Sequence, residues 1–188
     1  MRILLVRHTP PLIGRGICYG RLDIPSDPID GPLIAELAAA GTLESSKRVW
    51  TSPARRCEIL ADAIARHLSI PKMLDPRLQE LDFGDWEGKA WNDVPRSDLD
   101  NWAANPETFR PPGGESGAEL IARCYAVYVD ICRAEDDCTI VSHGGPLAIL
   151  RALFLGKPVD LLGPKAPMGT IYTIGTAFLK APAPPAGS

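Results

Sequence analysis

The chain has 188 residues, of which 45% are hydrophobic and 23% are charged, and its formal net charge is -3. These values are typical of one soluble globular domain with a substantial core. The slightly acidic balance argues against a surface for nucleic acid or an anionic membrane, so any positive potential must be local.

The start of the chain and its cysteines indicate a cytoplasmic protein. Met1-Arg2-Ile3 leads directly into a strand pattern, without the apolar segment and cleavage site of a secretory signal. No apolar run reaches the length of a membrane span. The five cysteines have no CxxC spacing and the three histidines add no zinc pattern, so we expect reduced thiols and no metal site. The sequence leaves a homodimer open.

The first predicted element is a buried strand, because Ile3-Leu4-Leu5-Val6 is wholly apolar, and it ends in Arg7 and His8. The prolines and glycines from 10 to 28 predict a loop. Its glycines do not form a dinucleotide fingerprint, because no helix opens behind them. A helix is expected over 32–40, ended by Gly41.

The next segment predicts a strand, a helix and a short strand. Arg48-Val49-Trp50-Thr51 is the strand, and a helix is expected from Ser52-Pro53 to a point before Pro71. Lys72-Met73-Leu74 predicts the short strand. The buried face of the helix is expected to comprise Ile59, Leu60, Ala63, Ile64 and Leu68.

Residues 75–88 form a charged, loop-like segment, and within 92–112 we expect only a short helix over 99–104. Ser116-Gly117-Ala118-Glu119 is a capping box, which predicts a helix reaching about Ala134. The remaining predicted elements are a strand over 139–142, a helix over 146–155 and a last strand over 169–174, paired antiparallel at an edge of the sheet.

This alternation of strands and helices predicts an α/β fold with three α/β/α layers and a mainly parallel sheet. We expect a single domain over 1–180 and a disordered Ala/Pro tail over 181–188. His8 and His143 each follow a buried strand. Because open parallel sheets bind ligands at the carboxyl ends of their strands, both histidines are expected to share one site.

Four separated motifs together resemble the histidine phosphatase superfamily, which includes cofactor-dependent phosphoglycerate mutase. They are Arg7-His8, Ser52-Pro53-Ala54-Arg55-Arg56, Glu80-Leu81-Asp82-Phe83-Gly84-Asp85-Trp86-Glu87-Gly88 and Ser142-His143-Gly144-Gly145. The resemblance covers about residues 1–178 and implies a phosphoglycerate mutase-like fold, a phosphohistidine intermediate and no cofactor or metal. The chain departs from the family at Thr9, where glycine is usual, and at Pro10-Pro11, where many members carry glutamate and threonine.

The resemblance implies that Arg7 and Arg56 clamp the phosphoryl oxygens, a task that suits a planar guanidinium. His143 donates a further hydrogen bond, and Gly144 belongs to the same substrate-binding set. Arg55 competes with Arg56, and the motif position, four residues after the serine, favours Arg56. The positive charges stabilise the negative charge that spreads over a phosphoryl group during transfer.

His8 matches the position of the nucleophile, and it must be neutral to attack phosphorus. Glu80 matches the acid/base position, where it protonates the leaving alkoxide and then deprotonates the hydrolytic water. Asp82 and Glu87 are the competing carboxylates in the same segment.

The sequence favours hydrolysis over mutase activity. Mutases of this family usually carry a longer insertion between the second arginine motif and the acid/base motif, whereas only residues 57–79 separate them here. Water should therefore reach the phosphohistidine. The alternatives are a phosphoglycerate mutase-like enzyme, a broad-specificity sugar-phosphate phosphatase, and a phosphate-binding regulatory module without activity.

The first loop and the acidic motif also resemble the α-ribazole phosphatase branch, which implies α-ribazole 5′-phosphate, from cobalamin assembly, as the substrate. Tyr19, Trp86 and Trp91 are candidates for stacking on its flat base. For Trp86 an equally good alternative is that it anchors the acidic loop to the core. Arg21 is expected either to contact the substrate or to pair with Asp23.

Overall fold

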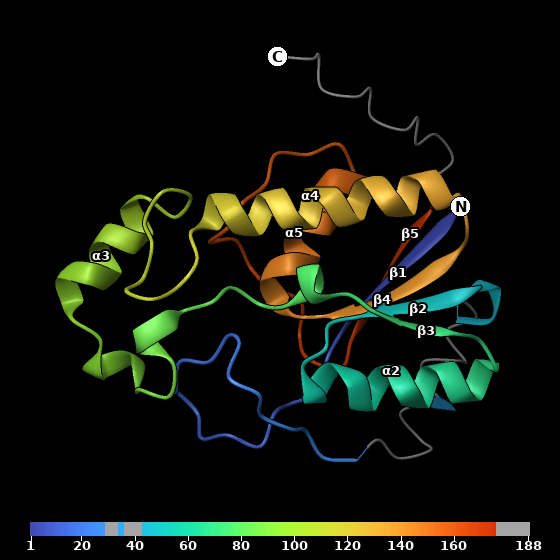
Figure 1. Cartoon of the computed structure of the whole chain (residues 1–188), viewed down its shortest axis with the longest axis horizontal. Coiled ribbons are helices and arrows are strands. Elements are labelled where there is room, and N and C mark those ends of the chain that lie inside the picture. The colour runs from blue at the N-terminus through green and yellow to red at the C-terminus, as the bar shows by residue number, and fades with distance from the viewer. Residues whose placement is uncertain (29–33, 36–42, 176–188) are drawn as a thin grey trace.

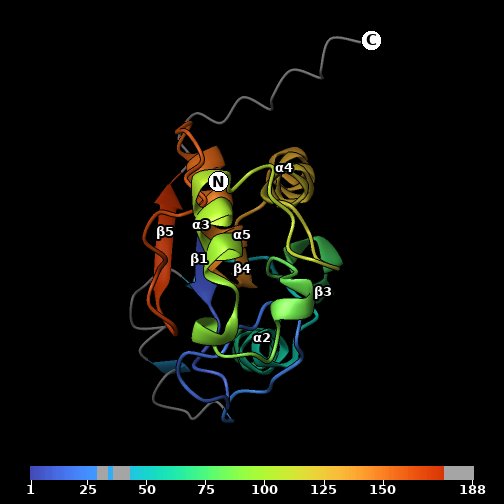
Figure 2. The ribbon, with the colours of Figure 1, turned by 90° about the vertical axis from the view of Figure 1, so that its left-hand side faces the viewer.

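A computed structural model describes residues 1–28, 34–35 and 43–175. Over these residues the strands form one mixed sheet in the order β3-β2-β4-β1-β5. The parallel strands are β1 (Arg2–Arg7), β4 (Cys138–Ser142), β2 (Arg48–Thr51) and β3 (Lys72–Leu74), and β5 (Ile171–Gly175) pairs antiparallel with β1. Figure 2 shows β5 and β3 at opposite edges of the sheet.

Helices flank the sheet on both faces. α2 (Arg55–Leu68) lies on one face, and α4 (Gly117–Ala134) and α5 (Gly144–Phe154) lie on the other (Figure 1). α3 (Arg96–Ala104) stands apart, at the same end of the molecule as the loop that follows β1 (Figure 1). Short 3-10 helices complete the described elements: η1 (Leu43–Ser45), η2 (Pro76–Leu78), η3 (Gly84–Trp86) and η4 (Trp91–Asp93). The predicted fold class, with its antiparallel edge strand, is confirmed.

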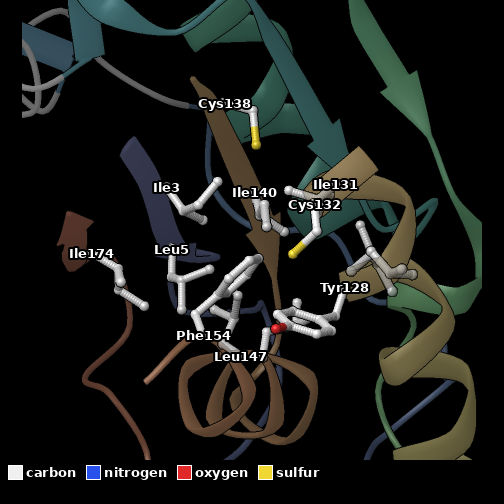
Figure 3. Packing of buried hydrophobic residues seen from close by; sticks show 13 residues of the cluster. Ile3, Leu5, Tyr128, Ile131, Cys132, Cys138, Ile140, Leu147, Phe154 and Ile174 are labelled. Carbon is white, nitrogen blue, oxygen red and sulfur yellow. The ribbon is translucent and has the colours of Figure 1, made fainter. Parts of the chain in front are cut away.

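Two apolar clusters hold the layers together. In the first, Leu147 and Phe154 of α5 and Tyr128 of α4 pack on Leu5 and Ile140 of the central strands (Figure 3). The second lies on the opposite face, where α2 packs against β1, β2 and β4. Because both faces of β1 and β4 are covered, their central residues are buried without alternation. This arrangement fixes the position of the two strand ends at which the histidines lie.

The prediction for α2 was wrong about the residue at which the helix begins and about some of the side chains on its buried face. The helix begins at Arg55, because Ala54 is still extended (φ -64°, ψ 132°). Its buried side chains are Arg56, Cys57, Leu60, Ala61, Ile64 and Ala65. Ile59, Ala63 and Leu68 are only partly buried. The helix is rotated so that a charged residue faces inward, which hydrophobic spacing alone does not reveal.

Two further predicted helices are present, one of them longer than expected. The capping box at Ser116 and Glu119 is present and opens α4. α3 starts at Arg96, three residues before the predicted short helix. The helix expected over 32–40 lies outside the described residues except for Ile34 and Ala35.

The predicted domain bounds and the predicted disorder of 181–188 stay predictions, because 176–188 lie outside the described residues. Within the described ranges, no helix has the length and apolarity needed to cross a membrane.

Candidate active site

The two histidines lie side by side at the carboxyl edge of the sheet. β1 and β4 are paired in register up to Arg7 and Ser142, so the next residues, His8 and His143, fall opposite each other. The His8 backbone N–H donates to the Ser142 carbonyl at 3.1 Å. The ring centroids are 5.1 Å apart at an interplanar angle of 64°. Both side chains are buried, so the predicted convergence is confirmed.

The surroundings of His8 define its tautomer. Its Nδ1 lies 2.7 Å from the Thr9 carbonyl oxygen, and because a carbonyl only accepts, Nδ1 carries the hydrogen. Burial lowers the pKa of His8 from 6.5 to about 3, and Arg56 and Arg7 add to the effect against the Thr9 hydrogen bond. The ring is therefore neutral near pH 7, with its lone pair on Nε2. Such an imidazole is a competent nucleophile.

Threonine in place of the family glycine leaves this contact intact. Among the described residues, only Ser69 and Glu135 are non-glycine residues with positive φ. Thr9 therefore adopts an ordinary backbone conformation while its carbonyl orients the His8 ring.

Two guanidinium groups flank the histidines, and each is held by backbone carbonyls. Arg56 is fully buried and donates from Nη1 to the Leu22 carbonyl (2.8 Å) and from Nη2 to the Gly20 carbonyl (2.6 Å). Arg7 donates from Nη1 to the Ala166 carbonyl at 2.6 Å. The Nε atoms of both arginines are buried without a hydrogen-bond partner among the described residues. Buried donors of this kind are normally paired, so both arginines keep a donor available for a bound anion.

Glu80 faces the N-terminus of α5. Its Oε1 and Oε2 each accept from the Gly145 N–H at 3.2 Å, and Oε1 also accepts from the Leu81 N–H at 3.0 Å. A Cβ at position 145 would collide with Oε1, so glycine is needed for this close approach. Gly144, the first residue of α5, follows His143 directly.

The segment that carries Glu80 is fixed from α4. Arg123 donates to the carbonyls of Arg77 (2.7 Å), Gln79 and Glu80 (2.9 Å). Glu115 pairs with the same guanidinium at 2.7 and 2.8 Å. Because three carbonyls are bound by one partly buried cation, the position of Glu80 is defined by the scaffold. Sequence analysis did not find Arg123 or Glu115, which lie outside the recognised motifs.

The two competing carboxylates have structural roles. Glu87 accepts from the backbone N–H groups of Arg21 (2.8 Å), Leu22 and Phe83 (3.0 Å), and so joins the first loop to the acidic segment. Asp82 accepts from the Gly84 N–H at 2.9 Å. Of the three candidates, Glu80 alone bonds to the N-terminus of α5 among the described hydrogen bonds.

Tyr19 lies next to Arg56, whereas Arg21 forms ion pairs that join two loops. The Arg56 guanidinium lies over the Tyr19 ring, 5.3 Å from its centroid. Burial raises the pKa of Tyr19, so its hydroxyl keeps its proton. Arg21 pairs with Asp82 and Glu115, each at 3.4 Å. Pairing with Asp23, one of the two alternatives for Arg21, is not among the described ion pairs, and contact with the substrate stays a prediction.

Asp23 instead accepts from the Arg55 N–H at 2.8 Å, at the start of α2. The Arg55 side chain is exposed, whereas that of Arg56 is buried. The preference for Arg56 over Arg55 therefore agrees with the geometry.

The tryptophans form an aromatic cluster with neighbouring side chains. Trp86 is only 2% exposed and packs against Phe83, Trp91, Trp102 and Phe109. Trp91 is partly buried in the same cluster. Trp86 thus anchors the acidic segment to the segment around α3, as the alternative interpretation held, and it is too buried to stack on a substrate.

Two further polar residues at the site were missed. Ser52 follows β2 and its Oγ lies 2.8 Å from Nε2 of His143; its place in the Ser-Pro motif was the available signal. Lys165 packs with Arg7 around Gly144, where an added Cβ would lie 3.2 Å from Lys165 Cγ and 3.3 Å from Arg7 Cζ. Burial lowers the pKa of Lys165, and the charges of Glu80 and Asp160 oppose this shift. No pattern in the sequence distinguished Lys165 from a surface lysine.

Neutral His8 makes the free energy of unfolding depend on pH. The His8 pKa is lower in the fold than its usual 6.5, so below pH 6.5 the unfolded chain binds more protons. The stabilisation is complete above pH 6.5 and is lost as the pH falls toward 3. We expect wild type to lose about 2 kcal/mol more than His8→Gln between pH 7 and pH 5.

Urea unfolding in phosphate-free buffer measures this difference. His67→Gln is the matched control, because His67 is exposed on the last turn of α2. That variant should follow the wild-type pH dependence. Equal pH dependence for wild type and His8→Gln would show that His8 titrates normally in the fold.

The chain resembles known proteins along nearly its whole length. Residues 3–172 match the sequence profile of the histidine phosphatase superfamily (branch 1). A Hydrogenobacter thermophilus protein provisionally named phosphoserine phosphatase 2 is 32% identical over 167 residues, which cover 86% of this chain and 82% of the relative. The adenosylcobalamin/α-ribazole phosphatase of Salmonella typhimurium is 30% identical over 121 residues, or 61% of this chain and 59% of the relative.

Solved structures agree on the fold. The α-ribazole phosphatase of Shigella flexneri superposes with a TM-score of 0.74 at 24% identity, covering 93% of this chain and 90% of that one. At this identity the likeness concerns the fold alone.

Proposed function

Because the chain belongs to the histidine phosphatase superfamily (branch 1) and is a phosphatase, we propose that it hydrolyses a small-molecule phosphate monoester through phosphohistidine on His8. The observation that carries this proposal is a neutral imidazole, with Nε2 unprotonated, beside two arginines whose Nε donors lack a partner in the described residues. A neutral nucleophile surrounded by positive charge suits attack on a phosphate dianion.

In the first step a bond forms between His8 Nε2 and phosphorus while the ester P–O bond breaks. Glu80, as the carboxylic acid, gives its proton to the departing oxygen, and the alcohol leaves. In the second step the Glu80 carboxylate takes a proton from water, whose oxygen attacks phosphorus. The P–N bond breaks, and inorganic phosphate and neutral His8 are restored.

Arg7 and Arg56 supply electrostatic stabilisation in both steps. Their carbonyl partners hold each guanidinium in place before substrate binds, and preorganised donors cost little reorganisation during the reaction. His143 adds a hydrogen bond to the same phosphoryl group. No residue in this scheme requires a metal or cofactor.

Hydrolysis is favoured over transfer to a second alcohol. The segment between Arg56 and Glu80 is fully used by α2, β3 and η2, so it supplies no extra chain to enclose the site. A non-enzymatic phosphate-binding module is disfavoured, because His8 and Glu80 are both present at the positions proposed for nucleophile and acid, and the relatives are named as phosphatases.

For the substrate we propose α-ribazole 5′-phosphate, on the pathway to cobalamin. The support is the resemblance of the first loop and of the acidic motif, together with the relative of that name. A further support is Tyr19, a partly buried aromatic side chain beside Arg56.

One observation favours a second candidate, a phosphate ester that carries a carboxylate, such as phosphoserine. Lys165 adds a third cation beside Arg7 at the start of α5, and a cation at this place suits a leaving group with its own negative charge. The Hydrogenobacter relative is provisionally named for phosphoserine.

A substrate panel with a charge variant separates the candidates. We expect kcat/KM to be highest for α-ribazole 5′-phosphate when compared with phosphoserine, 3-phosphoglycerate and fructose 2,6-bisphosphate. Lys165→Met should leave α-ribazole 5′-phosphate unaffected and raise KM for the carboxylated esters roughly tenfold.

The matched control is Lys157→Met, since Lys157 is exposed; it should not alter any KM. A preference for phosphoserine that disappears in Lys165→Met would establish the second candidate. Phosphate transfer to phosphoglycerate instead of water would show a mutase.

A further inference from the structure

We propose that Ser52 is a positioning residue: its hydroxyl donates to Nε2 of His143 and thereby places the ring hydrogen of His143 on Nδ1. The tautomer itself is independent of the reaction, whereas its catalytic consequence rests on the proposed function. With the hydrogen on Nδ1, His143 offers an N–H, and not a lone pair, to an anion bound at His8.

Three neighbouring strand ends place the residues in one row. The Ser52 N–H donates to the Val141 carbonyl (3.1 Å), just as the His8 N–H donates to that of Ser142 (3.1 Å). Since β2, β4 and β1 are neighbours in the sheet, Ser52, His143 and His8 follow one another along its edge. His143 therefore has Ser52 on one side and the nucleophile on the other.

The side chains around His143 are buried, so the direction of each hydrogen bond among them can be argued from their protein partners. Ser52 and Cys57 are fully buried and His143 is 1% exposed. Burial, together with the nearby charge of Arg56, places the pKa of His143 well below its usual range. The ring is thus neutral and carries one N–H, on either Nδ1 or Nε2. The hydrogen-bond partners of the ring decide which nitrogen carries the hydrogen.

The other partners of Ser52 favour donation to His143. Its Oγ already accepts from the Ala54 N–H at 3.3 Å, and the Cys57 thiol lies within hydrogen-bonding reach of the same hydroxyl. Burial raises the pKa of Cys57, so the thiol stays protonated and can donate. Because Ser52 Oγ accepts from the Ala54 N–H, we assign its own hydrogen to His143 Nε2, 2.8 Å away.

The opposite arrangement is less favourable. If Nε2 carried the hydrogen and donated to Ser52, the Ser52 hydrogen would have only Cys57 Sγ as an acceptor among these neighbours, and sulfur is a weak acceptor. Cys57 Sγ lies 3.4 Å from Nε2 and 3.8 Å from Nδ1 of the same ring, so it stabilises neither nitrogen strongly. The hydroxyl is the group that distinguishes the two tautomers.

Histidine nitrogen NMR on the resting protein tests the tautomer. In protein labelled with ¹⁵N-histidine at pH 7, we expect a protonated, pyrrole-type Nδ1 and an unprotonated, pyridine-type Nε2 for His143. His143→Gln identifies the signals. Ser52→Ala should convert them to the opposite tautomer or to a mixture, and Ser52→Thr, which keeps a hydroxyl, should retain the wild-type pattern.

Turnover of nitrophenyl phosphate gives the catalytic readout. Ser52→Ala should lower kcat roughly 10²-fold with a smaller change in KM, because the lost donor acts mainly in the transition state; Ser52→Thr should restore most of it. The matched control is Ser46→Ala. Ser46 is another buried serine, hydrogen-bonded to Thr139 Oγ1 at 2.8 Å at the opposite end of β2, and its loss should change stability but not kcat.

A pyrrole-type Nε2 in the wild-type protein, or an unchanged His143 pattern in Ser52→Ala, would overturn the proposal. These outcomes are independent of the proposed function, since the spectra need no substrate. Conversely, if His8→Ala kept its activity, the phosphohistidine mechanism would fail while the tautomer measured for His143 would still stand.

Discussion

Replacing His8 with alanine is expected to lower the turnover of nitrophenyl phosphate by about 10⁴-fold or more. The side chain lies at the carboxyl end of β1, with Nδ1 bound to the Thr9 carbonyl and Nε2 unprotonated. Neighbouring groups cannot replace the lost nucleophile, because His143 is bonded through Nε2 to Ser52. Steady-state turnover, with circular dichroism to confirm that the fold is retained, measures the effect.

The covalent intermediate provides a second readout of the same residue. Brief reaction with substrate followed by alkaline quenching should trap a phosphoryl group that is stable in base and labile in acid, mapped to the peptide that contains His8. His67→Ala is the control, because His67 is exposed and lies far along α2 from the site. Retained activity in His8→Ala, or a phosphoryl group on another residue, would reject this nucleophile.

Glu80→Gln is expected to slow the cleavage of alkyl phosphates by about 10²- to 10⁴-fold and that of nitrophenyl phosphate far less. An alkoxide needs a proton as it departs, whereas nitrophenolate leaves without one. Glutamine keeps the size and the acceptor oxygen that face the N–H groups of Leu81 and Gly145, so the backbone geometry should persist. The measurement is kcat for a series of esters plotted against the pKa of the leaving alcohol.

Glu87→Gln provides the comparison for Glu80. Glu87 binds three backbone N–H groups of the loops, so its loss should affect stability and KM without a dependence on the leaving group. If Glu80→Gln lowered kcat for nitrophenyl and alkyl phosphates equally, Glu80 would not be the acid.

The central part of the site could be predicted from the sequence because it depends on strand ends. An apolar run that ends in Arg7-His8 and a second one that ends before His143 define two buried parallel strands, and such strands deliver their next residues to one edge. Neither apolar run shows that β1 and β4 are direct neighbours, or in which register they pair. It follows from how the helices cover the sheet.

Residues that act through long-range contacts could not be predicted. Arg123 holds the acidic segment from the middle of α4, and Lys165 reaches the start of α5 from a loop that has no motif. For Arg21 the sequence left substrate contact and pairing with Asp23 as alternatives, whereas its ion-pair partners Asp82 and Glu115 are distant in the chain. Local spacing cannot rank partners that only the fold brings together.

The carbonyl anchors of the two arginines have a consequence for how new specificities can arise. The carbonyls of Gly20 and Leu22 hold Arg56, and the carbonyl of Ala166 holds Arg7. The loops around the leaving group therefore also position the two guanidinium groups. Grafting either loop from a homologue would therefore disturb reaction rate and selectivity together. Redesign, in the laboratory or by natural drift, should proceed more readily through single side chains at the rim than through exchange of whole segments.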